Sequence, residues 1–162
     1  MFSALSWRYF VALVTHEEAQ VCRAGGYVQY APNYYGDLLH RNDWVAVYAG
    51  RETRDRSSGW VRRFTGVGQV ADFAPTPVVG QCEYRYALKY IDAEPVPMAR
   101  IARHLSFIAQ GIDWGDNFHL PEHGLILVTP REFDIIAVSM KADPRWSFDK
   151  EYQRIHRVPG HE

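Results

Sequence analysis

The stretch that decides the start of the fold is Arg8-Tyr-Phe-Val-Ala-Leu-Val-Thr-His-Glu-Glu18. Aromatic and branched apolar residues follow one another almost without a break between its polar ends, which predicts a buried strand. Thr15 and Glu18 have the spacing of a capping box, in which the threonine hydroxyl and the glutamate carboxylate each accept a hydrogen bond from a backbone amide. A helix is therefore expected directly after the strand, and Gly25-Gly26, which can adopt left-handed backbone, should end it.

Similar patterns predict the other elements of the chain. Strands are expected at 27–30, 43–48, 64–71, 81–91 and 124–129. There, apolar runs or a two-residue alternation lie between turn residues. Gly66 and Gly68 in the third of these strands predict a bulge or a close approach of a ligand to the backbone. Helices are expected over 97–104 and, after a second capping box, over 130–142. Their buried stripes are Met98, Ile101, Ala102 and Leu105 in the first helix and Phe133, Ile136, Ala137 and Met140 in the second.

These elements predict an α+β protein. About six short, mostly antiparallel strands should form a small, partly open β-barrel, with about three helices around it. The chain has 162 residues, of which 47% are hydrophobic, and this suits one domain with a core of its own. The domain is expected at 8–142. Residues 143–162 turn polar and are expected to form a tail or an extra helix.

Composition argues against several classes of function. The formal net charge of -1 does not favour a non-specific nucleic-acid or membrane binder, so any nucleic-acid contact must be local. No apolar run reaches the roughly eighteen residues that a membrane span needs, and the first residues lack the pattern of an export signal. A cytoplasmic protein without membrane contact is therefore expected, with Cys22 and Cys82 reduced.

Two neighbouring segments carry side chains suited to a planar ligand. Leu105-Ser-Phe-Ile108 and Trp114-Gly-Asp-Asn-Phe118 place large rings, a hydroxyl and an amide close together in the chain. Rings of this kind stack on a flat ligand while polar groups contact its edge. Phe107 and Trp114 would suit an ordinary core equally well, and the sequence leaves both interpretations open.

One cluster of arginines lies in and just after the polar segment 50–59. Its members are candidates for a rim that contacts nucleic acid, because the arginine fork suits phosphates and base edges. Glu52 and Asp55 dilute the charge, so an ordinary solvated loop explains the cluster as well. The five members are Arg51, Arg54, Arg56, Arg62 and Arg63.

No catalytic residue, metal or cofactor is expected. His119 and His123 have a spacing that can bind zinc on a helix, but Pro121 argues against a helix and no nearby cysteine completes the ligands. Ser106 lacks the glycine context of an activated serine nucleophile. His16 lies at a helix start beside two carboxylates, where it could contact a pocket mouth or simply be a solvated or capping residue.

A series of short motifs follows a fixed order along 9–142. They are Phe-Val-Ala-Leu-Val-Thr-His-Glu-Glu-Ala, Gly-Gly-Tyr-Val-Gln, Asn-Asp-Trp-Val-Ala-Val-Tyr, Phe-Thr-Gly-Val-Gly-Gln-Val, Pro-Met-Ala-Arg, Leu-Ser-Phe-Ile, Trp-Gly-Asp-Asn-Phe and Pro-Arg-Glu-Phe-Asp-Ile-Ile-Ala. In this order and spacing the chain resembles the EVE domain family, which belongs to the PUA-like superfamily together with the YTH and ASCH domains.

The resemblance implies a PUA-like barrel whose central pocket recognises a modified base in DNA or RNA without catalysis. A flipped base would stack on Trp114, while Ser106 and Gln29 would contact its pairing edge. A nuclease or another defence-system protein is then a candidate partner. The residues that would line the pocket are Gln29, Tyr30, Tyr48, Thr65, Ser106, Phe107 and Trp114.

The chain departs from the family pattern at two places. Tyr30-Ala-Pro-Asn-Tyr-Tyr35 replaces a His-Gly-Lys-like segment, and His119 stands where many members have arginine. Both changes remove positive charge that would meet a phosphate. Two alternatives therefore stay open: an ASCH-like enzyme acting on RNA or a small amide, and a module that binds a small metabolite or a protein partner.

Overall fold

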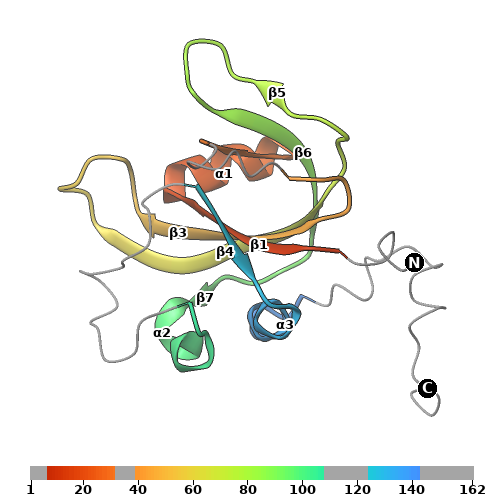
Figure 1. Ribbon diagram of the computed structural model, residues 1–162. Helices are drawn as coiled ribbons and strands as arrows, with labels where there is room; N and C mark the ends of the chain where they lie inside the picture. The colour runs from red at the N-terminus through yellow and green to blue at the C-terminus, as the bar shows by residue number, and fades with distance from the viewer. Residues whose placement is uncertain (1–6, 32–38, 108–123, 143–162) are drawn as a thin grey trace, which may run out of the picture.

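The computed structural model describes residues 7–31, 39–107 and 124–142. Within these ranges one curled, mostly antiparallel sheet forms a partly open barrel with helices packed on it (Figure 1). The predicted α+β class is therefore confirmed. The strands are β1 (Tyr9–Val14), β2 (Tyr27–Tyr30), β3 (Trp44–Arg51), β4 (Trp60–Val70), β5 (Thr76–Pro77), β6 (Tyr84–Ile91), β7 (Val96–Pro97) and β8 (Gly124–Val128). The helices are α1 (His16–Gly25), α2 (Met98–Ile101), which continues as a 3-10 turn over Ala102–His104, and α3 (Pro130–Ser139).

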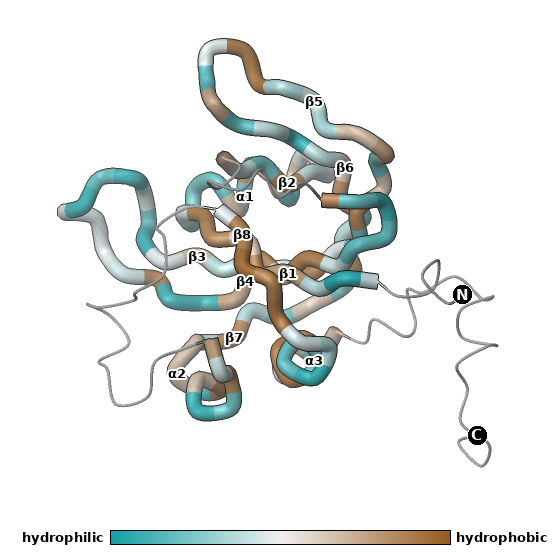
Figure 2. Tube along the Cα trace, viewed as in Figure 1, coloured by the Kyte–Doolittle hydropathy of each residue, from teal (hydrophilic) through white to brown (hydrophobic). Residues whose placement is uncertain are grey.

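The main path of the sheet has the strand order β2-β6-β4-β3-β1-β8, with β5 paired to β6 and β7 paired to β4. β1 and β3 pair in parallel, and the other described pairs are antiparallel. Hydrophobic residues are prominent along β8, whereas the β3–β4 hairpin tip is mostly hydrophilic (Figure 2). No helix in the described ranges is long and apolar enough to cross a membrane. The segment 143–162, expected to be a tail or an extra helix, lies outside the described residues.

β1 leads directly into α1, as predicted. The capping box is complete, because Thr15 Oγ1 accepts from the Glu18 amide at 3.1 Å and the Glu18 carboxylate accepts from the Thr15 amide at 2.9 Å. Gly26 follows the helix with a φ of 74°, and its amide donates to the Arg23 carbonyl. Glycine adopts this left-handed backbone without the steric cost of a side chain. Both ends of α1 are therefore determined locally.

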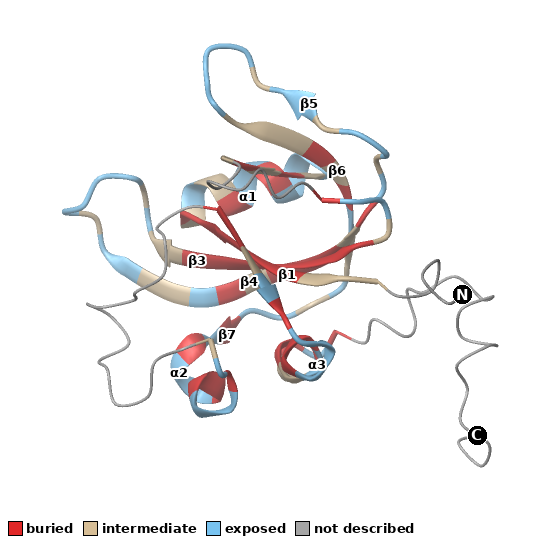
Figure 3. Ribbon diagram, viewed as in Figure 1, coloured by how far each residue is buried: buried red, intermediate tan, exposed pale blue. Residues whose placement is uncertain are grey.

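The central strands β1 and β3 are buried on both faces. In β3, Trp44, Ala46 and Tyr48 belong to one packed layer, whereas Val45 and Val47 belong to another. α2 and α3 cover the first layer, which we call the helix-face core (Figures 1 and 3). α1 packs on the second layer, the barrel-interior core, within the curl of the sheet. Side chains alternate along a strand, so burial on both faces requires the continuous apolar run seen in β1.

The structure corrects the predicted element boundaries in three places. β3 reaches Arg51 and β4 begins at Trp60, so polar residues expected in a loop form the arms of a hairpin. Backbone groups make the ladder hydrogen bonds, and polar side chains do not prevent them. β5 and β7, with two residues each, are too short to show any periodicity in the sequence. The helix expected over 97–104 is α-helical only over its first turn, yet its apolar stripe is buried as predicted.

The bulge predicted from the glycines of β4 is present. Val47 pairs with Gly66 and Tyr48 pairs with Phe64, which leaves Thr65 as the extra residue. Gly68 is needed for a different reason. A Cβ added there would lie 2.7 Å from Leu88 Cγ and 2.9 Å from the Lys89 carbonyl oxygen, so β4 and β6 approach too closely for a side chain.

We expect Gly68→Ala to lower the free energy of unfolding by about 1–3 kcal/mol, because the backbone of β6 must move to admit the methyl group. Urea unfolding monitored by tryptophan fluorescence measures the change. Gly59→Ala is the matched control, since its nearest neighbour would be Glu52 Cγ at 3.9 Å, an ordinary contact. Equal stability of the two variants would contradict the close approach of β4 and β6.

Candidate functional site

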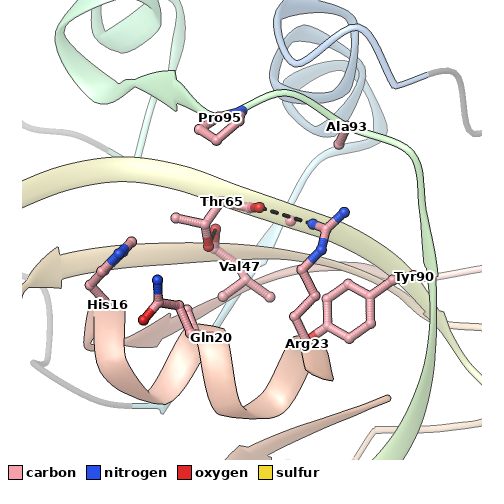
Figure 4. A pocket seen from close by; sticks show the side chains of 10 residues that line it. His16, Gln20, Arg23, Val47, Thr65, Tyr90, Ala93 and Pro95 are labelled. Carbon is pink, nitrogen blue, oxygen red and sulfur yellow. Dashed lines mark hydrogen bonds between the residues drawn. The ribbon is translucent and has the colours of Figure 1, made fainter. Parts of the chain in front are cut away.

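A cavity of about 320 Å³ lies between α1 and the inner surface of the sheet (Figure 4). This volume is at the lower end of the range for small-ligand sites. Its floor is mainly apolar and its edges carry polar side chains. The lining residues are His16, Ala19, Gln20 and Arg23 from α1, Val47 from β3, Thr65 and Gly66 from β4, Tyr90 from β6, and Ala93 and Pro95 from the link between β6 and β7.

One face of α1 supplies the helical wall. His16, Ala19, Gln20 and Arg23 follow the three- and four-residue spacing that places side chains on one side of a helix. The capping box fixes where this face begins, so the register of the wall follows from Thr15. His16 Nδ1 is buried and makes no hydrogen bond to any described residue. The helix therefore presents a buried polar atom to a cavity of ligand size.

Arg23 and Tyr90 form the opposite end of the cavity. Arg23 Nη1 donates to the Thr65 carbonyl at 3.2 Å, and the guanidinium lies 5.6 Å from the centroid of the Tyr90 ring. Tyr90 donates its hydroxyl to the Tyr27 carbonyl at 2.9 Å. Burial raises the pKa of Tyr90, so the phenol stays protonated and able to donate this bond at alkaline as well as neutral pH. Both side chains are thus held in place without a ligand.

Gly66 keeps this end of the cavity open. A Cβ at Gly66 would lie 3.1 Å from the Tyr90 ring and 3.3 Å from Arg23 Nη1, so a side chain would displace one or both. The neighbouring bulge residue Thr65 donates its hydroxyl to the Val47 carbonyl at 3.4 Å. Because the bulge interrupts the regular pleat, both Thr65 and Gly66 line the cavity. The glycine pattern of this strand therefore has a role in the site as well as in the fold.

Of the predicted ligand-binding residues that the structure describes, only Thr65 lines this cavity. Gln29 lies in a second, more polar depression, where its amide donates to Gln81 and Glu83 and accepts from Arg85. Tyr30 is part of the barrel-interior core, stacked on Tyr86 with ring centroids 6.1 Å apart and its hydroxyl accepting from the Leu39 amide. Tyr48 lies in the helix-face core against Phe64. Tyr30 and Tyr48 face opposite sides of the sheet, so the structure does not bring them together in one pocket.

The predicted wall of Ser106 and Phe107 packs against α3. The Ser106 amide and hydroxyl both donate to Glu132 Oε2 at 2.6 Å. Phe107 is half-buried against the helix-face core, as the alternative interpretation of an ordinary core residue expects. Trp114, the main stacking ring of the prediction, lies outside the described residues, as do His119 and His123. In the described part of the chain no cluster of three side chains suited to a metal ion is found.

The predicted arginine rim divides into two groups. Arg54 is neutralised by Glu18 at 2.5 Å and Glu83 at 2.9 Å. Hydrogen bonds to these carboxylates raise its pKa above the ordinary value for arginine. Arg51 stabilises the β3–β4 hairpin, because its guanidinium donates hydrogen bonds to the carbonyls of Arg56 and Ser58. Of the other three members, Arg56 is exposed in the hairpin tip, and Arg62 and Arg63 lie on the outer half of β4, where Arg63 is exposed.

Three of the polar or aromatic side chains of the cavity were not predicted from the sequence. Gln20, Arg23 and Tyr90 lie far in the sequence from the aromatic segments that suggested a site. For His16, contact with a pocket mouth was one of two interpretations, the other being a solvated or capping residue. A signal did exist, because His16, Gln20 and Arg23 repeat at helical spacing in an otherwise ordinary amphipathic segment. Nothing in the sequence alone, however, places Tyr90 opposite that helix face.

Comparison with known proteins gives a limited similarity. The chain is 26% identical over 108 residues to a UPF0310 protein from Mycolicibacterium gilvum (strain PYR-GCK). The alignment covers 65% of this chain and 74% of that protein. No family model matches the chain.

Glu132 provides a pH-dependent test of how the 105–107 turn is attached to α3. Burial alone would raise its pKa, but hydrogen bonds from Ser106 and Thr129 outweigh burial and lower the pKa below that of an ordinary glutamate. A lowered folded-state pKa means that the carboxylate contributes stability above the ordinary glutamate pKa of about 4.3, and that this contribution is lost as the pH falls through the folded value.

We therefore expect Glu132→Gln to destabilise the protein at neutral pH and to differ progressively less from the wild type as the pH falls below about 4. Urea unfolding at several pH values measures this. Glu94→Gln is the control, because the Glu94 side chain is exposed and, among the described residues, its carboxylate pairs with the exposed Lys141. A destabilisation by Glu132→Gln that did not depend on pH would show that the charge of Glu132 is not what holds the turn.

Proposed function

We propose that the protein is a non-catalytic binding module that holds one planar heterocycle, a modified nucleobase of DNA or RNA, in the cavity between α1 and β4. The observation that carries the proposal is the cavity of about 320 Å³ itself, with an aromatic ring and a guanidinium fixed at one end and polar side chains along its edges. A site of this size admits a single small ring system rather than a folded polymer.

The lining chemistry supports a heterocycle over an aliphatic ligand. Tyr90 offers the edge or face of a ring, while Ala19 and Val47 provide an apolar floor. His16 and Gln20 bring groups that can both donate and accept hydrogen bonds, which is what the edge of a nucleobase requires. A ligand without polar edge groups would leave the buried His16 Nδ1 without a partner, which is unfavourable.

The order of motifs that resembles the EVE domain family points in the same direction, since the resemblance implies recognition of modified bases. An enzyme is the weaker candidate. Among the described lining residues, the hydroxyl of Thr65 donates to the Val47 carbonyl rather than to a general base, so no activated nucleophile is assembled. A small free metabolite with a planar ring would use the same contacts and is separated from the proposal by experiment.

The test is a titration of the protein with short oligonucleotides that contain methylated or hydroxymethylated cytosine, or methylated adenine, and with their unmodified counterparts. Fluorescence anisotropy of labelled strands gives the affinities. We expect one modification to bind more tightly than its unmodified strand. Equal, weak binding of every modified and unmodified strand would remove the proposal, and binding of a free planar metabolite alone would favour the small-molecule alternative.

Gly66→Ala should weaken binding of the preferred modified strand by up to about tenfold, because its methyl group takes up space at this end of the cavity and shifts the Tyr90 ring or the Arg23 guanidinium, and a stacking contact is worth about 1–3 kcal/mol. Gly59→Ala, remote from the cavity, should leave the affinity unchanged. Urea unfolding of both variants shows whether the fold is kept. A folded Gly66→Ala protein with wild-type affinity would mean that the ligand does not occupy this cavity.

A further inference from the structure

The described lining of the cavity contains basic side chains but no carboxylate. Arg23 carries a permanent positive charge and His16 can carry one, whereas none of the described lining residues is an aspartate or a glutamate. This bias is particular to the cavity, because the second, more polar depression is lined by Glu17, Glu18 and Asp55. A cavity with a guanidinium at one end and no carboxylate in its described lining favours a ligand that is anionic at that end.

Acidic residues that adjoin the lining in sequence do not line the cavity. They are Glu17, Glu18, Asp92 and Glu94. The Glu18 carboxylate forms an ion pair with Arg54, on the side of the second depression. The Glu94 carboxylate forms an ion pair with Lys141, which follows α3. Arg23 itself forms no ion pair with a described residue, so its charge remains to be met by a ligand.

The guanidinium of Arg23 is held in place and still has donors for a ligand. Its Nη1 donates to the Thr65 carbonyl at 3.2 Å, and the Tyr90 ring lies beside it, with the centroid 5.6 Å from the guanidinium carbon (Figure 4). A guanidinium has five N–H groups in a planar fork that matches the two oxygens of a carboxylate. The Thr65 carbonyl uses one of these groups, so the others can donate to acceptor atoms of a ligand. Because the side chain is already oriented, binding loses less conformational freedom.

The position of this guanidinium indicates which part of the ligand is anionic. A planar ring that contacts Tyr90 brings its own edge next to the Arg23 guanidinium, because the two side chains lie together at one end of the cavity. His16 comes seven residues earlier on α1, about 10 Å away along the helix axis, so it contacts a different part of a small ligand. An acidic group attached directly to the ring therefore reaches Arg23. The phosphate of a nucleotide is separated from the base by the sugar and would lie farther from Tyr90.

We propose that the heterocycle bound in this cavity carries a carboxylate directly on its ring, and that Arg23 binds this carboxylate through the remaining N–H groups of its guanidinium. The inference rests on the proposed function and narrows it, because it selects a carboxylated nucleobase among the modified bases. A methylated base occupies the same apolar floor but offers Arg23 no added acceptor, so it binds more weakly. Arg23 is then the residue that determines specificity for the charge of the modification.

The test compares free cytosine nucleosides that carry a carboxylate, a carboxamide or a methyl group on carbon 5 of the ring. The carboxamide has nearly the shape of the carboxylate but no charge, so the ratio of their two affinities isolates the effect of charge. Isothermal titration calorimetry at low salt should show the carboxylate binding to the wild-type protein about three- to tenfold more tightly than the carboxamide. The ratio should fall as added salt screens the exposed guanidinium of Arg23.

Arg23→Gln should bring this affinity ratio close to one, because the amide removes the charge. Arg23→Lys keeps the charge without the planar fork and should retain part of the ratio. Arg100→Gln is the matched control and should leave the ratio unchanged, since Arg100 is an exposed arginine of α2, on the opposite side of the sheet from α1 (Figure 1). Urea unfolding shows whether each variant keeps its fold. A folded Arg23→Gln protein with the wild-type ratio would overturn the assignment to Arg23.

Titrations with benzoate, benzamide and deoxycytidine monophosphate separate this inference from the proposed function. If the nucleosides bind but the carboxylate has no advantage over the carboxamide, the inference is wrong and the proposed function stands. If no nucleoside binds, while benzoate binds more tightly than benzamide and loses this advantage in Arg23→Gln, the proposed function fails and the site for a planar carboxylate stands. A monophosphate that binds more tightly than its nucleoside, together with no advantage of the ring carboxylate, would overturn the placement of the acidic group on the ring. Absence of binding by every probe would overturn both proposals.

Discussion

The burial of β1 and β3 on both faces is the constraint on which the rest of the structure depends. A sheet whose central strands have no solvent-facing side must be covered twice, and each buried Val, Leu, Ile or Phe side chain is worth roughly 1.5–3 kcal/mol. The chain covers the inner face with α1, which follows β1 directly, and the outer face with α2 and α3. Because the capping residue Thr15 directly follows β1, the position of α1 in the curl follows from a local hydrogen-bonding pattern.

The cavity exists because this inner cover is incomplete. Ala19 is the buried contact of α1 with the barrel-interior core, and Gly66 stands opposite, so two small residues separate the helix from the sheet. Protein interiors are close-packed, and a gap lined by a histidine, a glutamine and an arginine does not stabilise a core, because it loses packing contacts and buries polar groups. Tyr90 and Arg23 are nevertheless held by bonds to backbone carbonyls, which keeps the space open. A prepared cavity with polar edges is the arrangement expected of a binding site.

The formal net charge of the protein does not show how its charged side chains are distributed over the structure. Glu18 of α1 and Glu83, which directly precedes β6, form ion pairs with Arg54, and Trp60 at the start of β4 is 42% exposed. Five arginines between positions 51 and 63 thus gather in one hairpin of a protein whose formal net charge is -1.

By itself, the sequence determined the features that depend on neighbouring residues. Both capping boxes and the left-handed glycine after α1 arise from contacts within a few positions. The buried stripe of α3 and the bulge in β4 were also predicted correctly, because helical spacing and the glycines of the strand mark them in the sequence. Tertiary structure alone decided which side chains share a site. Gln29, Tyr30, Tyr48 and Thr65 all lie on predicted strands, but the curl and pairing order of the sheet send them to different places. Tyr90 contacts Arg23 because β6 pairs with β4 next to α1. Pairing between segments so far apart in the chain produces no periodic pattern in the sequence from which it could be predicted.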